Sequence, residues 1–219
     1  MQMQSEAKRW RRFDKKVDTG GSYLRDKDSC YYYMEKIDHG YDKSRANQLI
    51  FNFKKPPDRK QNPTEWFYKE QAIEQFADDL GQLINVLLSS MSPNTISSVP
   101  TVLVPAISSK QKTNPEYDDR LLRVAEAVAS QHPVLNVIDA FSRAFDIRPL
   151  HENGTRNPSY ISAGMEFCGF GDISPSLVII LDDLLVSGAT FVACADAISL
   201  QYPDCFVVGV FWARQTYKL

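Results

Sequence analysis

Four short segments of the chain are almost continuously apolar and rich in β-branched residues. They do not alternate between apolar and polar positions, as a strand with one face in water would. Strands that are buried on both faces of a parallel sheet have this composition. The sequence therefore predicts four buried parallel strands, at residues 101–105, 135–141, 177–181 and 206–211.

Helical patterns separate these strands. Asn114-Pro115 predicts a helix start, with Asn as the N-cap and Pro at the first position, and apolar residues from Leu121 to Val128 form one face of this helix. A second helix is expected at about residues 191–200, directly after the third strand. The strand–helix–strand order predicts an α/β fold, in which helices flank a central parallel sheet.

The part of the chain before these strands has a different pattern. A long helix is expected from Glu65 to Ser89, with Thr64 as its N-cap. Proline-containing linkers at Pro56-Pro57 and Asn62-Pro63 precede it, and residues 29–55 predict strands or a hairpin.

The sequence also predicts how the chain is divided and where a long loop lies. Residues 1–63 form a small N-terminal appendage, or hood, and residues 64–219 form the core. The polar segment 145–160, which contains Gly and Pro, predicts a long mobile loop.

Composition changes this picture little. Hydrophobic residues make up 43% and charged residues 24%, as in ordinary globular proteins. The longest clean apolar run, 177–181, is far shorter than the roughly 20 residues of a membrane span, and the N-terminus has no apolar signal core. We therefore expect a cytoplasmic protein without a membrane partner. The spacing of the four cysteines predicts free thiols and no zinc site.

The net charge of −2 hides an uneven distribution. Residues 1–63 carry 15 Lys/Arg and 9 Asp/Glu, whereas residues 64–219 carry 10 and 18. The basic excess begins at Lys8-Arg9-Trp10-Arg11-Arg12 and continues to Lys15-Lys16. Such a block suits a nucleic acid or an acidic protein partner, and it equally suits a solvated arm.

One segment carries the chemistry. Residues 178–190 read Val-Ile-Ile-Leu-Asp-Asp-Leu-Leu-Val-Ser-Gly-Ala-Thr, so an apolar strand ends on two carboxylates and a small-residue turn leads into a helix. The backbone N–H groups of the turn, the hydroxyls of Ser187 and Thr190 and the positive end of the helix suit a phosphate. Asp182 and Asp183 can accept hydrogen bonds from ribose hydroxyls nearby. The segment therefore predicts a site for a phosphorylated ribose.

This segment resembles the phosphoribosyl pyrophosphate (PRPP) motif of type I phosphoribosyltransferases over 13 contiguous residues. The resemblance implies the type I phosphoribosyltransferase fold. It also implies that Asp182 and Asp183 contact the ribose hydroxyls. The residues that would hold the 5′-phosphate are Val186, Ser187, Gly188, Ala189 and Thr190.

The same family has a pyrophosphate-binding loop after its first core strand. Here the matching residues are Ile107-Ser108-Ser109-Lys110, with Lys112 close behind. Hydroxyls, backbone amides and an ammonium group suit a polyanion. The family also closes a flexible loop over the reaction, and Arg148, His151 and Arg156 in segment 145–160 match that place. Such a lid would keep water from an oxocarbenium-like transition state.

The substrate base is constrained at one position. Relatives that act on 6-oxopurines have an Asp immediately before the Thr-Gly of the phosphate loop, and this chain has Val186 there. The difference argues against the hypoxanthine–guanine subclass. An adenine-, orotate- or uracil-type base stays open, as does the absence of any base.

A looser resemblance points to the competence-protein (ComF-like) branch of the fold. It rests on Tyr31-Tyr32-Tyr33, Asn47-Gln48-Leu49-Ile50, Phe53-Lys54-Lys55 and the strand Val207–Arg214. The four-cysteine zinc finger that usually begins that family is absent, so a role tied to the finger is not implied here.

The resemblance implies transfer of a phosphoribosyl group between Mg²⁺-bound PRPP and a nucleobase. The expected catalytic residues are Asp182, Asp183, Lys110 and Arg148, with Mg²⁺ held indirectly at the two aspartates through the ligand. The alternative is a regulatory or effector protein, such as a DNA-uptake or bacterial antiphage (retron) accessory protein, that keeps the ligand-binding fold and acts through a protein or nucleic-acid partner. The sequence leaves the oligomeric state open.

Overall fold

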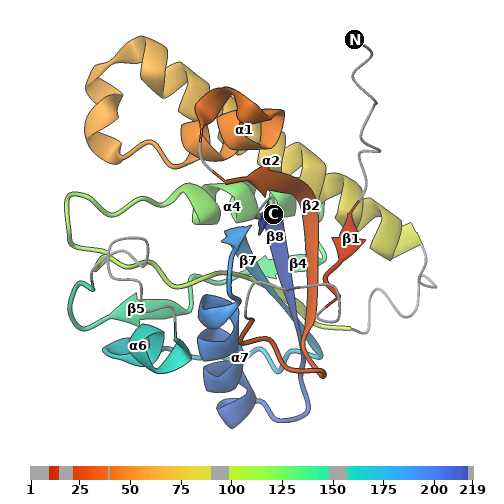
Figure 1. The fold of residues 1–219 in the computed structure, drawn as a ribbon. Coiled ribbons are helices and arrows are strands. Elements are labelled where there is room, and N and C mark those ends of the chain that lie inside the picture. The colour runs from red at the N-terminus through yellow and green to blue at the C-terminus, as the bar shows by residue number, and fades with distance from the viewer. Residues whose placement is uncertain (1–9, 15–21, 39, 90–98, 148–156, 217–219) are drawn as a thin grey trace.

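A computed structural model describes residues 10–14, 22–38, 40–89, 99–147 and 157–216. Within this part, a six-stranded sheet forms the centre of the molecule (Figure 1). Only its first pair of strands is antiparallel, and all the other neighbours run parallel. The spatial order is β1 (Arg11–Arg12), β2 (Ser29–Ile37), β8 (Phe206–Thr216), β7 (Leu177–Leu185), β3 (Thr101–Pro105) and β4 (Leu135–Val137). The predicted α/β class with a central parallel sheet is confirmed.

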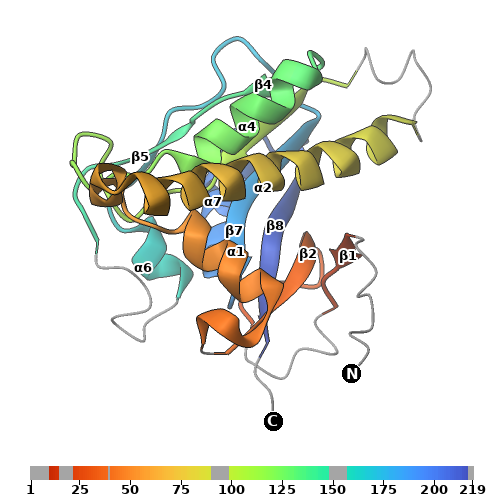
Figure 2. The same cartoon turned by 90° about the horizontal axis from the view of Figure 1, so that it is seen from above.

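Helices cover both faces of the sheet (Figures 1 and 2). One face packs against α1 (Arg45–Phe53), α2 (Pro63–Ser89) and α4 (Arg120–Gln131), and the other packs against α7 (Ala189–Gln201). Side chains alternate between these layers along a strand. In β7, the side chain of Leu181 therefore packs on the α2–α4 side, while that of the preceding residue packs on the α7 side.

The strand order creates a switch point at the centre of the sheet. From β3 the chain crosses through α4 to β4 on one side, and it later returns to β7 on the other side of β3. The loops that leave β3 and β7 therefore diverge, and in open α/β sheets a ligand crevice forms between such loops, at the carboxyl ends of the strands.

The long segment between β4 and β7 adds a small second layer. β5 (Phe141–Arg143) pairs antiparallel with β6 (Met165–Phe167), outside the central sheet. The predicted strand 135–141 is therefore wrong as a single element, because only its first three residues join the main sheet. Phe141 is instead buried in the apolar cluster on the α7 side, so the apolar run serves two different layers.

The predicted helix start at Asn114-Pro115 is wrong, since α4 begins at Arg120. Asn114 caps a turn instead. Its Oδ1 accepts a hydrogen bond from the backbone N–H of Glu116 (2.8 Å), and its Nδ2 donates to Asp146. These local bonds satisfy the polar groups that would otherwise begin a helix.

Of the strands or hairpin expected within residues 29–55, a strand is confirmed but the hairpin is wrong. The segment forms the strand β2 and then helix α1, whose N-cap Ser44 accepts a hydrogen bond from the N–H of Asn47. The long helix is confirmed as α2, but Asn62 caps it in place of Thr64 by accepting from the N–H of Glu65 at 3.2 Å. The short 3-10 helices η2 (Tyr41–Lys43) and η3 (Pro57–Gln61) fill the connections.

Residues from the predicted hood lie within the central sheet. Strand β2 pairs in parallel with β8 over most of its length, and Trp10 donates its indole N–H to the backbone carbonyl of Asp79 in α2 at 3.0 Å. The predicted loop at residues 145–160 contains helix α6 (Pro158–Ser162) at its end, and residues 148–156 lie outside the described residues. In the described part of the chain, no helix is long and apolar enough to cross a membrane.

Candidate functional site

A cavity of about 890 Å³ opens at the switch point of the sheet. Its walls come from the loops after β3 and β7, the approach to α4 and the segment after α1. The predicted ribose, phosphate and pyrophosphate positions at Asp182, Asp183, Val186–Thr190 and Ser108–Lys110 all line it. The predicted lid residues Arg148, His151 and Arg156 lie outside the described residues. Two motifs that are about 70 residues apart in the sequence thus share one cavity.

The turn after β7 is shaped by Gly188. This residue has φ 75°, in the left-handed region that favours glycine, and it is the N-cap of α7. A Cβ atom here would come within 2.6 Å of the buried Leu24 side chain. The backbone N–H of Tyr23 also donates to the carbonyl of Ser187 at 2.8 Å. Residues 22–24 therefore hold the turn in its conformation, through the packing of Leu24 against Gly188 and the hydrogen bond from Tyr23.

The beginning of α7 is suited to an anion. Among the described residues, no side chain caps this helix end, and the N–H groups of a first helical turn have no partner within the helix. Ala189 and Thr190 lie in this turn and line the cavity. The positive end of the helix dipole adds to the attraction.

The loop after β3 is held by hydrogen bonds within itself and to Ile147. The backbone N–H of Lys110 donates to Ser108 Oγ at 3.1 Å, which folds the loop back on itself, and the N–H of Ile147 donates to the carbonyl of Ser109 at 2.9 Å. The cationic side chains of this loop are already paired: Lys110 Nζ lies 2.5 Å from Glu116, and Lys112 Nζ lies 2.6 Å from Asp139. A polyanion would have to compete with these carboxylates.

A buried guanidinium supports the same loop. Arg143, only 5% exposed, donates from Nε to the carbonyl of Ser108 (2.6 Å) and from Nη1 to the carbonyls of Ile161 and Ala163 (both 2.9 Å). Among the described residues, no carboxylate forms an ion pair with it. Burial lowers the pKa of Arg143, but a guanidinium stays protonated in proteins. The cavity wall therefore keeps a positive charge beside the Ser108–Lys110 loop.

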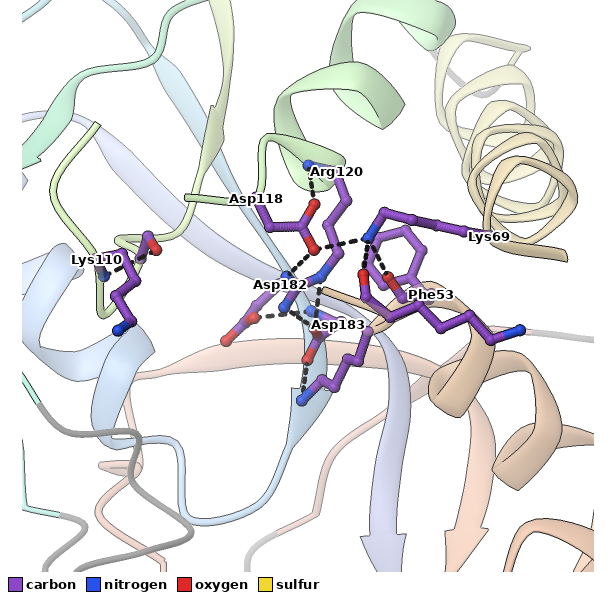
Figure 3. Close-up of polar contacts among 10 residues, drawn as sticks. Phe53, Lys69, Lys110, Asp118, Arg120, Asp182 and Asp183 are labelled. Carbon is purple, nitrogen blue, oxygen red and sulfur yellow. Dashed lines mark hydrogen bonds and ion pairs between the residues drawn. The ribbon is translucent and has the colours of Figure 1, made fainter. Parts of the chain in front are cut away.

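The second aspartate of the motif belongs to a buried charge network (Figure 3). Asp183 Oδ2 accepts from Arg120 Nη2 at 2.8 Å, and its Oδ1 lies 2.9 Å from Lys54 Nζ. Arg120 also binds Asp118 (2.8 Å), and Asp118 binds the fully buried Lys69 (2.7 Å). The ammonium of Lys69 donates further to two backbone carbonyls near the end of α1. The network joins β7 to α4, α2 and the end of α1.

The first aspartate has a different environment. Asp182 is half-buried, and its Oδ1 accepts a hydrogen bond from the N–H of Asp183 at 2.8 Å. Among the described residues, no cation forms an ion pair with it. It pairs in register with Phe211, whose side chain belongs to the α7-side cluster. Asp182 is thus the carboxylate of the pair that a ligand can reach without breaking an ion pair.

The two pKa values are shifted in opposite directions. Burial and then the negative charge of Asp183 raise the pKa of Asp182. Burial acts in the same sense on Asp183, but the charges of Lys54 and Arg120 outweigh it and lower the pKa of Asp183 below its usual range. Neighbouring carboxylates that differ in this way are typical of functional sites.

Sequence reasoning missed Lys54, Arg120 and Arg143 as site residues. Arg120 lies 63 positions before the aspartate that it binds, and Lys54 lies 129 positions before it. Lys54 belongs only to the looser resemblance, at Phe53-Lys54-Lys55, and Arg120 carries no local signal, since charged residues are common next to helix ends. The basic block around Arg11 is described only in part. There, Arg11 forms an ion pair with Glu35 at 3.1 Å, and its role in binding a partner stays a prediction.

In the described part of the chain, no group of three or more His, Cys, Asp or Glu side chains is placed to hold a metal ion. No protein-family model and no curated protein matches the chain.

Proposed function

We propose that this chain is a phosphoribosyltransferase-type protein of the type I fold, which binds Mg²⁺–PRPP or a nucleoside 5′-phosphate and transfers the phosphoribosyl group to or from a nucleobase. One observation carries the proposal: the carboxylate pair, the turn at the start of α7 and the Ser108–Lys110 loop line one cavity at the switch point of a parallel sheet. Its volume lies within the roughly 300–1,000 Å³ of small-molecule sites.

The 5′-phosphate is assigned to the turn at residues 186–190. The first-turn N–H groups of α7 and the Thr190 hydroxyl supply donors without a carboxylate in the turn itself. The ribose hydroxyls are assigned to Asp182, which lies at the carboxyl end of β7 and is free of ion pairs among the described residues. Asp183 then acts mainly by positioning, since its two oxygens are held by Lys54 and Arg120.

The pyrophosphate of PRPP is assigned to the loop after β3. Arg143 fixes the carbonyl of Ser108 and leaves a positive charge in the wall. Lys110 and Lys112 can exchange their carboxylate partners for phosphate oxygens, because ion pairs this exposed are weak. Preorganised charge of this kind stabilises a leaving group that gains negative charge.

The proposed transfer is a direct displacement, with no covalent enzyme intermediate. The bond between ribose C1 and the pyrophosphate oxygen breaks, and its electron pair leaves with pyrophosphate. A ring nitrogen of the base forms the new bond to C1 with its lone pair, and the proton that this nitrogen loses passes to solvent. The protein holds both reactants in line and excludes competing water.

A magnesium ion fits this donor set only together with the ligand. Mg²⁺ commonly binds one or two carboxylates plus substrate phosphates, and Asp182 is the available carboxylate. When bound, Mg²⁺ would offset part of the charge of the pyrophosphate group.

Calorimetry with Mg²⁺–PRPP, followed by pyrophosphate release with adenine, orotate and uracil, tests the proposal. We expect binding that Asp182→Asn weakens by at least about tenfold, because a charge-assisted hydrogen bond to a hydroxyl is lost. The exposed Asp204→Asn, in the turn between α7 and β8, is the matched control and should bind as the parent does. Absence of binding to PRPP, ribose 5-phosphate and AMP would overturn the proposal, as would an Asp182→Asn variant that binds like the parent.

The regulatory or effector alternative makes a different prediction for the same measurements. The ion pairs of Asp183 favour it, since a carboxylate already held by two cations stabilises the fold without taking part in chemistry. Binding of PRPP without pyrophosphate release for any base would select this alternative.

A further inference from the structure

Four aromatic side chains form a connected strip on the surface beside the cavity. Each is about half exposed: Tyr41 (49%), Phe51 (57%), Phe67 (55%) and Tyr68 (46%). They come from η2, the end of α1 and the beginning of α2. Figure 1 shows these segments together at the top of the molecule, above the carboxyl ends of β7 and β8. We call these residues the aromatic strip.

The rings of the strip are close enough to act as one platform. The ring centroids of Tyr41 and Phe51 lie 5.1 Å apart, and those of Phe67 and Tyr68 lie 5.7 Å apart. Lys55 joins the two pairs, since its Nζ lies 6.0 Å from the Phe51 centroid and 5.2 Å from that of Tyr68. An ammonium between two rings orders both of them by cation–π attraction.

The surroundings of the strip are basic. Residues 41–68 carry six Lys/Arg and three Asp/Glu, a balance of +3 in a chain whose net charge is −2. Five exposed basic side chains belong to the same stretch of chain as the strip; they are Lys43, Arg45, Lys54, Arg59 and Lys60. Two of them already have carboxylate partners, since Lys54 pairs with Asp183 and Arg59 with Glu65. A purely apolar partner would gain nothing from these charges, whereas a polyanion would.

We propose that the aromatic strip binds single-stranded nucleic acid. Bases stack on exposed rings without regard to sequence, while the phosphates between them are attracted to the interleaved Lys and Arg side chains. Base-paired nucleic acid buries the faces of its bases and cannot stack on the strip. This site is separate from the proposed PRPP site, because none of the four rings lines the cavity.

The strip leads to the mouth of the cavity. Lys54 and Pro56 line the cavity, and Lys55, which follows one and precedes the other in the chain, has its Nζ within 6.0 Å of the Phe51 and Tyr68 ring centroids. A strand that stacks on Phe51 and Tyr68 therefore passes close to the opening. Occupancy of the strip and occupancy of the cavity would then influence each other.

Fluorescence anisotropy with a labelled oligothymidylate of about 20 nucleotides tests the proposal on the full chain. We expect binding that weakens steeply with added salt. Phe51→Ala and Tyr68→Ala should each weaken it by about tenfold, as the loss of one stacked base does. Phe206→Ala is the matched control, since Phe206 is equally exposed (58%) and lies at the start of β8, at the opposite end of the sheet.

Three outcomes would overturn the proposal. In the first, the oligonucleotide does not bind at low salt. In the second, a duplex of the same length binds as tightly as the single strand. In the third, light scattering shows a dimer that Phe51→Ala or Tyr68→Ala dissociates, because the strip would then contact a second copy of the chain. Calorimetry with Mg²⁺–PRPP on Phe51→Ala separates this test from that of the proposed function, since the cavity residues are unchanged.

Discussion

The two sides of strand β7 use the same residue type in opposite ways. On the α2–α4 side, Asp183 is buried and both its oxygens are held by cations. On the α7 side, Asp182 is half-buried and lines the cavity beside the turn that leads into α7. The strand alternation sends neighbouring carboxylates to different layers, and each layer supplies different partners. A pair of acids in a motif is therefore not a pair of equivalent ligands.

The largest expected effect is a difference in the free energy of unfolding between variants of the two aspartates. Asp183→Asn removes the buried charge that Arg120 and the exposed Lys54 share, so we expect the free energy of unfolding to fall by about 3 kcal/mol. Asp182→Asn should change it by less than about 1 kcal/mol, because no ion pair is lost. Urea unfolding followed by fluorescence measures both. Equal losses in the two variants would contradict the comparison.

On the α7 side of the sheet, we expect stability to depend on the packing of the turn, whereas on the α2–α4 side it depends on ion pairs. Gly188→Ala adds a Cβ against Leu24 at a positive φ, and we expect a loss of about 2 kcal/mol together with loss of phosphate-ligand binding. Gly171→Ala is the matched control, since its φ is 60° and nothing lies within 4 Å of the added Cβ. That variant should lose only about 1 kcal/mol, from backbone strain.

Thermal unfolding measures both glycine variants on the same scale. A Gly188→Ala variant that loses no more stability than Gly171→Ala would show that Leu24 yields to the added atom. In that case the shape of the turn would not depend on residues 22–24.

The smallest expected effect is a difference in pH dependence, on the order of 1 kcal/mol. The pKa of Asp182 is raised in the folded chain, so its ionisation costs stability as pH rises from the unfolded value of about 4 through the folded pKa. The pKa of Asp183 is lowered, so its contribution is present above about pH 4 and is lost as pH falls through the folded pKa.

Unfolding curves at several pH values test this difference in sign. Relative to the parent, Asp182→Asn should become more stable as pH rises, whereas the deficit of Asp183→Asn should shrink in acid. Parallel curves for the two variants would contradict the assignment of opposite pKa shifts.

Much of the fold could be predicted from local pattern. The apolar runs at 101–105, 177–181 and 206–211 all lie in strands of the central sheet, and the long helix before them is present. The failures occurred where local polar bonds or a distant layer decided the outcome. The predicted helix start failed because Asn114 caps a turn and donates a hydrogen bond to Asp146. The predicted strand 135–141 failed because Phe141 is buried in the cluster on the α7 side.

The sequence by itself determined that an apolar strand, two carboxylates, a small-residue turn and a helix follow one another. These elements can be predicted from the sequence because each is formed by residues that are adjacent in the chain. Only the tertiary structure decided that Arg120 and Lys54 hold Asp183, and that Asp182 stays available to the cavity. Charges from distant segments meet through the packing of α1, α2 and α4 on the sheet, and a local pattern contains no record of that packing.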